Sequence, residues 1–285
     1  MAEDPPLKEK AICANCGAKL HGRFCSKCGE KRLKPSDFAF SHLLKELFEN
    51  FSHADSRLLR SLWYVVRRPG FLSAEYLNGR RKPYLKPLSF FLLINVLYFL
   101  TIPFSTLRTF EAPLKFQYMN PYGKVAKEMV DARTAGMDSQ AMAGFEEKFN
   151  HENHSLSKSL LIILAPLLAL PLWMLFGRRK PYFAQHFVVA LHFLSLQLLL
   201  NIVFGIVLKG GVTSTIFGFR PEVHFFIEVV EPLLWFCLLG YVSFKTVYEE
   251  KWPATLSKTM VMVFLWFPIL ILYRFLIFLL TLVYL

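Results

Sequence analysis

Runs of hydrophobic residues dominate the sequence after a more polar first third. A helix needs about 20 apolar residues, at a rise of ~1.5 Å each, to cross the ~30 Å hydrocarbon core of a bilayer. Stretches of about that length recur along the chain, and they are residues 88–107, 160–176, 183–208, 225–244 and 260–285. The pattern therefore predicts an all-α integral membrane protein with about five transmembrane helices.

A different pattern occupies residues 36–86, ahead of the first apolar run. Apolar residues recur there at helical spacing, so cytoplasmic amphipathic helices are expected over 36–51, from Asp55 to Val66 and from about Leu72 to Asn78. The Pro69-Gly70 pair should separate the last two helices. A basic face opposite Trp, Phe and Leu is typical of a helix lying in the headgroup plane. The alternative is that these helices pack on one another as a small soluble domain.

Basic charge orients the predicted bundle. Residues 1–87 hold 17 of the 33 Lys and Arg residues but only 9 of the 21 Asp and Glu residues. Cations flank the cytoplasmic ends of spanning helices, so the N-terminus is expected in the cytoplasm and the C-terminus on the opposite side. Residues 108–158, whose charge is balanced, become an extracytoplasmic loop. Candidate contacts to anionic inner-leaflet lipid are Arg67, Arg68, Arg80, Arg81 and Lys82.

The composition agrees with a membrane location. The chain is 54% hydrophobic and 16% aromatic, which excludes an ordinary soluble domain. A net charge of +12 would also suit nucleic acid, but the cations gather beside apolar runs, so membrane contact is the favoured interpretation. Residues 1–10 are polar, and we expect a disordered lead there rather than a signal peptide.

Residues 11–32 contain cysteines in the pattern C-x2-C-x8-C-x2-C. Two residues between paired cysteines let both thiolates reach one metal ion, and a glycine after each pair permits the tight turn. Four thiolates close a tetrahedral shell, so we expect a zinc ribbon with structural Zn2+, and a redox dithiol pair or an iron–sulfur site are the alternatives. A closed shell leaves no position for catalysis. As the purpose of the ribbon, a structural cap or docking module is favoured over a nucleic-acid reader. The expected ligands are Cys13, Cys16, Cys25 and Cys28.

Ionisable residues also fall inside the predicted spans. They are His186, His192, Glu228, Glu231 and Arg274. Such residues cost ~2.5–3.5 kcal/mol at the centre of a membrane helix and therefore face partners or water. Glu231 and Arg274 are expected at depths that would allow an ion pair, which favours a role in helix packing. The alternative is a polar cavity used for a substrate, a proton or a lipid headgroup.

Two further motifs follow the cysteine pairs in order. They are an Arg-Pro-Gly turn at residues 68–70 and the run Tyr-x-x-Gly-Arg-Arg-x-x-Tyr-x-x-Pro over residues 76–87. Together these motifs resemble a bacterial family of polytopic membrane proteins of unknown function. The resemblance covers residues 13–107 and implies a location in the bacterial inner membrane. It implies no activity and assigns no catalytic residue.

The sequence contains no visible nucleophile–base pair, phosphate-binding loop or open metal site, so a non-enzymatic protein is expected. We expect the zinc ribbon and the interfacial helices to recruit or sense a cytoplasmic protein partner or inner-leaflet lipid. A small transporter or lipid-handling protein built around the intramembrane polar residues is the alternative. Membrane lipids are the expected partners, nucleic acid is not, and a homo-oligomer is compatible with the pattern.

Overall fold

The structure, a computed structural model, describes residues 12–20, 22–32, 55–101, 110, 112–207 and 231–285. The predicted lead, the predicted helix over 36–51 and Glu228 lie outside these residues. In the described part of the chain, the regular structure is helical except for two isolated β-bridges near the N-terminus.

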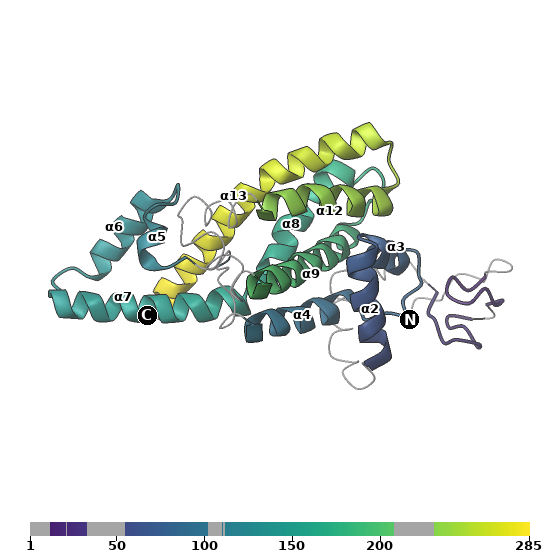
Figure 1. Cartoon of the computed structure of the whole chain (residues 1–285), viewed down its shortest axis with the longest axis horizontal. Helices are drawn as coiled ribbons and strands as arrows, with labels where there is room; N and C mark the ends of the chain where they lie inside the picture. The colour runs from purple at the N-terminus through teal and green to yellow at the C-terminus, as the bar shows by residue number, and fades with distance from the viewer. Residues whose placement is uncertain (1–11, 21, 33–54, 102–109, 111, 208–230) are drawn as a thin grey trace, which may run out of the picture.

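Apolar helices pack into one hydrophobic core (Figure 1). They are α4 (Pro87–Thr101), α8 (Leu164–Phe176), α9 (Phe183–Val207), α12 (Glu231–Tyr248) and α13 (Trp252–Tyr284). α9 lies at the centre, and residues 184–198 are buried against α4, α8 and neighbouring elements. α13 packs along α12 and α8. The five helices alternate in direction between two ends of the molecule (Figure 1).

By length and composition, two helices in the described residues can cross a membrane, α9 over Phe183–Gly205 and α13. A third span results if α7 (Ser139–Ser159) and the segment Leu161–Phe176, which bend by 52° at their junction, count as one. α4 and the Leu233–Tyr248 part of α12 are apolar but shorter. The structure therefore supports two to three spans directly. α4 has 15 described residues, fewer than the ~20 that a spanning helix needs.

Some helix boundaries differ from those in the hydrophobic pattern. α13 begins at Trp252 rather than at 260, with Pro253 in its first turn, where the missing N–H has no intrahelical acceptor to lose. Residues 252–259, a mixed segment with Thr, Ser and Lys, are helical and precede the apolar run in the same helix. The second apolar run starts with a short 3-10 helix, η3 (Leu161–Ile163), before α8 begins.

Residues 112–159, expected as a loop, fold into helices at one end of the bundle. They form α5 (Leu114–Gln117), α6 (Gly123–Arg133) and α7, which pack on the last turns of α13 through a second apolar cluster. Its buried members are Leu114, Ala126, Val130, Phe149, Phe278 and Leu282. A hydrogen bond from Asn153 Nδ2 to Thr281 Oγ1 (3.3 Å) also joins α7 to α13. We call this unit the α5–α7 cap.

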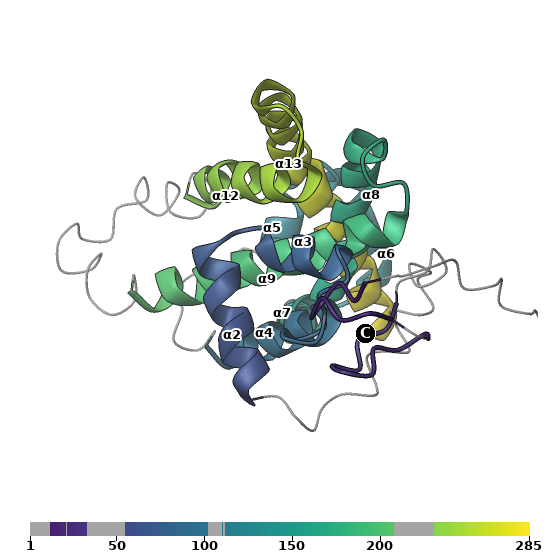
Figure 2. The same ribbon diagram turned by 90° about the vertical axis from the view of Figure 1, so that its right-hand side faces the viewer.

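The opposite end carries α2 (Asp55–Arg67), α3 (Phe71–Leu77) and the cysteine-containing segment (Figure 1). α3 packs on α9 and α12. α2 runs across α4 and α9 in both views rather than alongside them (Figures 1 and 2). The Pro69-Gly70 turn connects α2 and α3, in agreement with the sequence pattern.

Candidate metal centre and its attachment to the bundle

The cysteine pairs come together in one cluster. The Sγ atoms of Cys13 and Cys28 are 3.6 Å apart, as are those of Cys16 and Cys25, and all four Sγ atoms lie within 4.8 Å of one another. A tetrahedral site with Zn–S bonds of ~2.3 Å has S···S edges of about 3.8 Å. The four thiols can therefore hold a metal ion, as the sequence spacing predicted.

Two similar turns create this cluster. The backbone N–H of Gly17 donates to Cys13 O (2.9 Å), and that of Gly29 donates to Cys25 O (2.7 Å). Both glycines have positive φ angles, +72° and +68°, which a residue with a Cβ adopts at a cost. An isolated β-bridge flanks each turn, Ile12 with Lys19 and Phe24 with Lys31. Each turn thus aims its two thiols at the same point.

Hydrogen bonds give the thiols different acidities. The Asn15 side chain, followed by the backbone N–H of Glu30, lowers the pKa of Cys28 to about 6. The backbone N–H of Ala18 lowers the pKa of Cys16, but the Cys28 side chain and burial outweigh it and raise that pKa to about 12. The cluster therefore ionises unevenly on its own. A divalent cation would stabilise it, because the cation neutralises all coordinating thiolates together.

The carboxylate of Glu30 attaches this cysteine-containing segment to the helix bundle. Glu30, which follows the second turn, is 6% exposed, and its Oε2 accepts the backbone N–H groups of Lys82 (3.0 Å) and Arg81 (3.3 Å). These residues belong to the loop between α3 and α4. A cavity of about 120 Å3 separates the segment from the end of α3. Hydrogen bonds to a charged group each contribute about 1.5–3 kcal/mol, so Glu30 is a strong attachment point.

Other contacts occupy the cations of the same loop. Arg80 forms an ion pair with Glu75 (2.5 Å), and Arg81 donates from Nε to Tyr76 O (3.2 Å), with its guanidinium 4.0 Å from the centre of the Tyr76 ring. Lys82 lies against Gly29, where a Cβ would meet its Nζ at 2.9 Å. Three of the five cations expected at the lipid surface therefore contact α3 or the metal-binding segment.

The remaining two cations lie on α2 and the turn after it. The guanidinium of Arg67 is 5.1 Å from the centre of the Trp63 ring, and that of Arg68 is 6.0 Å from the Phe71 ring. Both arginines are exposed.

Within the core, His186 is satisfied by local partners. Its Nε2 donates to Lys180 O (2.8 Å), so Nδ1 accepts from the hydroxyl of Tyr248, also at 2.8 Å. The two rings are stacked with centroids 5.5 Å apart. A neutral histidine with both nitrogens engaged fixes the turn between α8 and α9 against α12.

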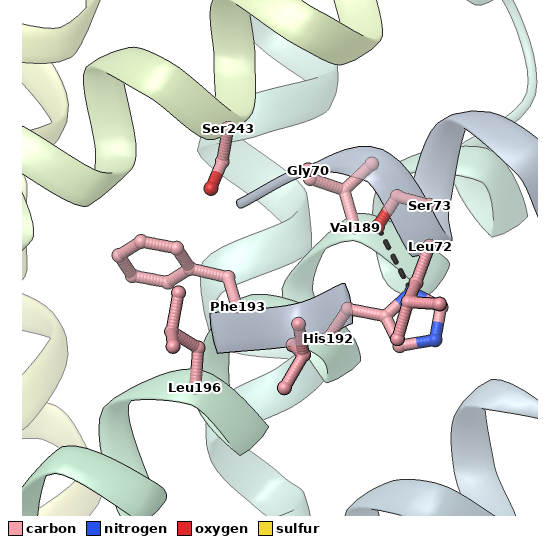
Figure 3. Close-up of a pocket in the computed structure, with 9 residues that line it drawn as sticks. Gly70, Leu72, Ser73, Val189, His192, Phe193, Leu196 and Ser243 are labelled. Atoms are coloured by element: carbon pink, nitrogen blue, oxygen red, sulfur yellow. Dashed lines mark hydrogen bonds between the residues drawn. The ribbon is translucent and has the colours of Figure 1, made fainter. Parts of the chain in front are cut away.

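His192 lies elsewhere on α9 and has a different environment. Its Nδ1 is 2.9 Å from Ser73 Oγ on α3, while Nε2 is buried with no hydrogen-bond partner among the described residues (Figure 3). A cavity of about 10 Å3 adjoins this pair and also reaches Gly70 and Ser243. That volume suits a single water molecule, not an organic solute.

Among the polar residues of the predicted spans, the side chains of His186, His192 and Arg274 are described, and they have separate surroundings. Arg274 is half-buried near Tyr122 of the α5–α7 cap, where its charge acts against the burial that raises the pKa of Tyr122 to about 12. The side chains of Glu228 and Glu231 lie outside the described residues. The expected ion pair between Glu231 and Arg274 therefore stays a prediction.

The hydrophobic pattern did not reveal a partly buried ion-pair cluster that links the α8–α9 turn to the α12–α13 turn. Both turns lie at the end of the bundle that carries the cysteine-containing segment, which we call the ribbon end (Figure 1). Glu250, 8% exposed, accepts from Lys258 Nζ at 2.7 and 2.8 Å, and Arg179 Nε lies 3.8 Å away. Lys245 Nζ also donates to Glu250 O. The sequence signal was the mixture of acids and lysines between residues 245 and 258, but their pairing depends on how α8, α12 and α13 pack.

Residues 55–99 match a family model described as "Protein of unknown function (DUF3667)". The matched segment comprises α2, α3 and α4 up to two residues before its end. No curated protein and no solved structure matches the chain. The similarity thus covers the helices to which the metal-binding segment is attached, and it assigns no activity.

Proposed function

We propose that the chain is a non-enzymatic protein of the bacterial inner membrane, in which a zinc ribbon and interfacial helices recruit or sense a cytoplasmic protein partner or inner-leaflet lipid. The observation that carries this proposal is the attachment of the cysteine cluster to the α3–α4 loop through Glu30. A metal-binding segment fixed to a membrane helix bundle can transmit binding of a partner to that bundle.

Zinc is the ion that fits the cluster best. Four thiolates at tetrahedral edge lengths form a closed shell, which is the arrangement of structural zinc sites. Zinc has no redox chemistry, so the ion would serve to fold and hold the ribbon. No coordination position is left for a substrate.

The arrangement of charge supports an orientation with the ribbon in the cytoplasm. The basic turn Arg178–Lys180 and the turn around Lys251 lie at the same end as the ribbon, whereas the α5–α7 cap lies at the other (Figure 1). The alternating directions of α4, α8, α9, α12 and α13 suit five passes through the membrane, with the C-terminus on the extracytoplasmic side. The one-water cavity beside His192 gives little support to the alternative of a solute transporter.

Photo-crosslinking in cells tests this proposal. A photoreactive amino acid at Lys27, an exposed position on the ribbon, should give a defined adduct with a cytoplasmic protein or a lipid. Glu30→Ala removes the acceptor of two backbone N–H groups and weakens ribbon attachment by about 1.5–3 kcal/mol per bond. We therefore expect that adduct to be lost or redistributed in Glu30→Ala.

Glu128→Gln, which changes an exposed acid of α6 in the distant cap, is the matched control and should leave the adduct unchanged. Identical adducts in Glu30→Ala, Glu128→Gln and the unmodified chain would contradict a role for the attached ribbon. If the cellular phenotype of the protein persists after deletion of residues 1–32 but is lost in Arg274→Leu, that result would favour the transporter.

A further inference from the structure

α2 has two apolar faces, although a surface helix needs only one. Ser61 and Val65 are buried on the face that packs against the bundle. On a different side, Leu59, Trp63 and Val66 are 70%, 58% and 55% exposed. Positions 59, 63 and 66 are separated by four and three residues, so they form one continuous ridge. We call these three residues the α2 ridge.

We infer that the α2 ridge is inserted into the headgroup layer of an anionic lipid leaflet. This inference deepens the proposed function and rests on it in one respect, because it takes the ribbon end of the molecule to face the cytoplasmic leaflet. It assigns the lipid contact to a surface different from the basic loop at residues 80–82.

The charge beside the ridge identifies the occupant. α2 begins with the acid Asp55, and from Ser56 to the end of the turn after the helix all charged residues are arginines, namely Arg57, Arg60, Arg67 and Arg68. Arg60 and Arg67 are exposed and lie next to the ridge on the helix surface. A protein partner could cover an apolar ridge, but a cluster of arginines beside it is complementary to lipid phosphates.

The Trp63 ring suits the same boundary. The guanidinium of Arg67 lies 5.1 Å from the centre of this ring. The apolar ring and the cation therefore form one amphipathic unit. Tryptophan gathers at membrane interfaces because its ring is apolar and its N–H is polar. In this arrangement Trp63 would point toward the acyl chains while Arg67 stays with the phosphates.

Hydrogen bonds hold α2 beside the start of α4, where we place the membrane interface. Ser61 Oγ accepts the backbone N–H of Leu85 at 2.9 Å and donates to Arg57 O at 2.7 Å. Leu85 lies two residues before α4 begins, so the bond fixes α2 beside the point at which the first apolar helix starts. Because α2 also runs across α4 and α9, it would lie flat in the interface of a membrane that those helices enter (Figures 1 and 2).

The loop of residues 80–82 is a weaker candidate for lipid contact. Glu75, Tyr76 and the ribbon residues Gly29 and Glu30 already contact its cations or its backbone. The α2 ridge, by contrast, is exposed over its whole length.

Fluorescence quenching in proteoliposomes tests the inference on the full-length protein. The protein is reconstituted in phosphatidylcholine vesicles with or without phosphatidylglycerol, and the lipids carry bromine either near the headgroup or near the bilayer centre. The contribution of Trp63 is the difference between the unmodified chain and Trp63→Phe, which changes only an exposed side chain. We expect Trp63 to be quenched by the shallow bromines more than by the deep ones.

Two further variants separate charge from position. In Arg60→Gln/Arg67→Gln we expect the additional quenching caused by phosphatidylglycerol to be lost, because each basic residue near an anionic surface contributes about fivefold to partitioning. Met137→Trp, at an exposed position in the distant α5–α7 cap, supplies a matched control whose added fluorescence should not be quenched.

A Trp63 signal that is unquenched in both lipid mixtures would overturn the inference, and would leave a second copy or a protein partner to cover the ridge. The same conclusion follows if quenching is identical with and without phosphatidylglycerol. The result also remains distinct from the crosslinking experiment. A quenched Trp63 with unchanged ribbon adducts would reject the proposed function and retain the lipid contact.

Discussion

Replacing Gly70 by alanine is expected to destabilise the protein by about 2–5 kcal/mol, because strain and overpacking combine at one position. Gly70 joins α2 to α3 with a φ angle of +84°. A Cβ there would lie 2.5 Å from the carbonyl oxygen of Ser243 and 2.8 Å from its Cα, both part of the α12 backbone. Neither atom can move away as a flexible side chain would.

Gly136→Ala is the matched control, since its φ angle is +85° but no heavy atom lies within 4 Å of the added Cβ. It should cost only the strain of about 1–2 kcal/mol. Thermal unfolding of the purified protein in detergent, followed by circular dichroism, measures both variants. Equal melting temperatures for the two variants would show that α3 does not approach α12 closely.

The second large effect is expected from the cysteine cluster. Cys25→Ser should abolish stable metal binding, because serine supplies no thiolate and leaves three ligands in a site built for four. Without the ion the short ribbon has little apolar core of its own, so it should unfold. Metal analysis of the purified protein should find about one zinc ion per unmodified chain and almost none in the variant.

Cys237→Ser is the control for this substitution, because Cys237 lies in α12, away from the cluster. Hydrogen exchange gives a second readout. Backbone amides of residues 12–32 should lose protection in Cys25→Ser and after chelation, and the amides of Arg81 and Lys82 should follow because Glu30 no longer holds them. Full metal content in Cys25→Ser would contradict the assignment of the four-cysteine cluster as the metal site.

Local sequence patterns predicted the features that depend mainly on neighbouring residues. The cysteine spacing predicted the cluster, because two residues between thiols determine the turn geometry almost alone. The Pro69-Gly70 pair predicted the break between α2 and α3. Continuous apolar runs located α4, α9 and α12 in outline, since a helix that is apolar all round has few alternatives.

The features that depend on tertiary packing were not accessible in this way. Glu30 contacts a loop some fifty residues later in the chain, and Glu250 pairs with Lys258 and Arg179 only because three helices meet. The cap was expected only as an extracytoplasmic loop, because its helices are not apolar enough to span a membrane and the apolar cluster that they share with the end of α13 depends on tertiary packing. The Ser73–His192 hydrogen bond likewise joins residues 119 positions apart.

The central claim is that the ribbon end and the α5–α7 cap lie on opposite sides of a membrane, and thiol labelling tests it most directly. Single cysteines at Met137 in the cap and at Ser257 near the ribbon end, both exposed positions, are introduced into the Cys237→Ser chain and treated with a membrane-impermeant maleimide. In intact spheroplasts Met137→Cys should react, whereas Ser257→Cys should exceed the unsubstituted background only after permeabilisation. Labelling of both positions from the same side, or of Ser257→Cys alone in intact spheroplasts, would contradict the account.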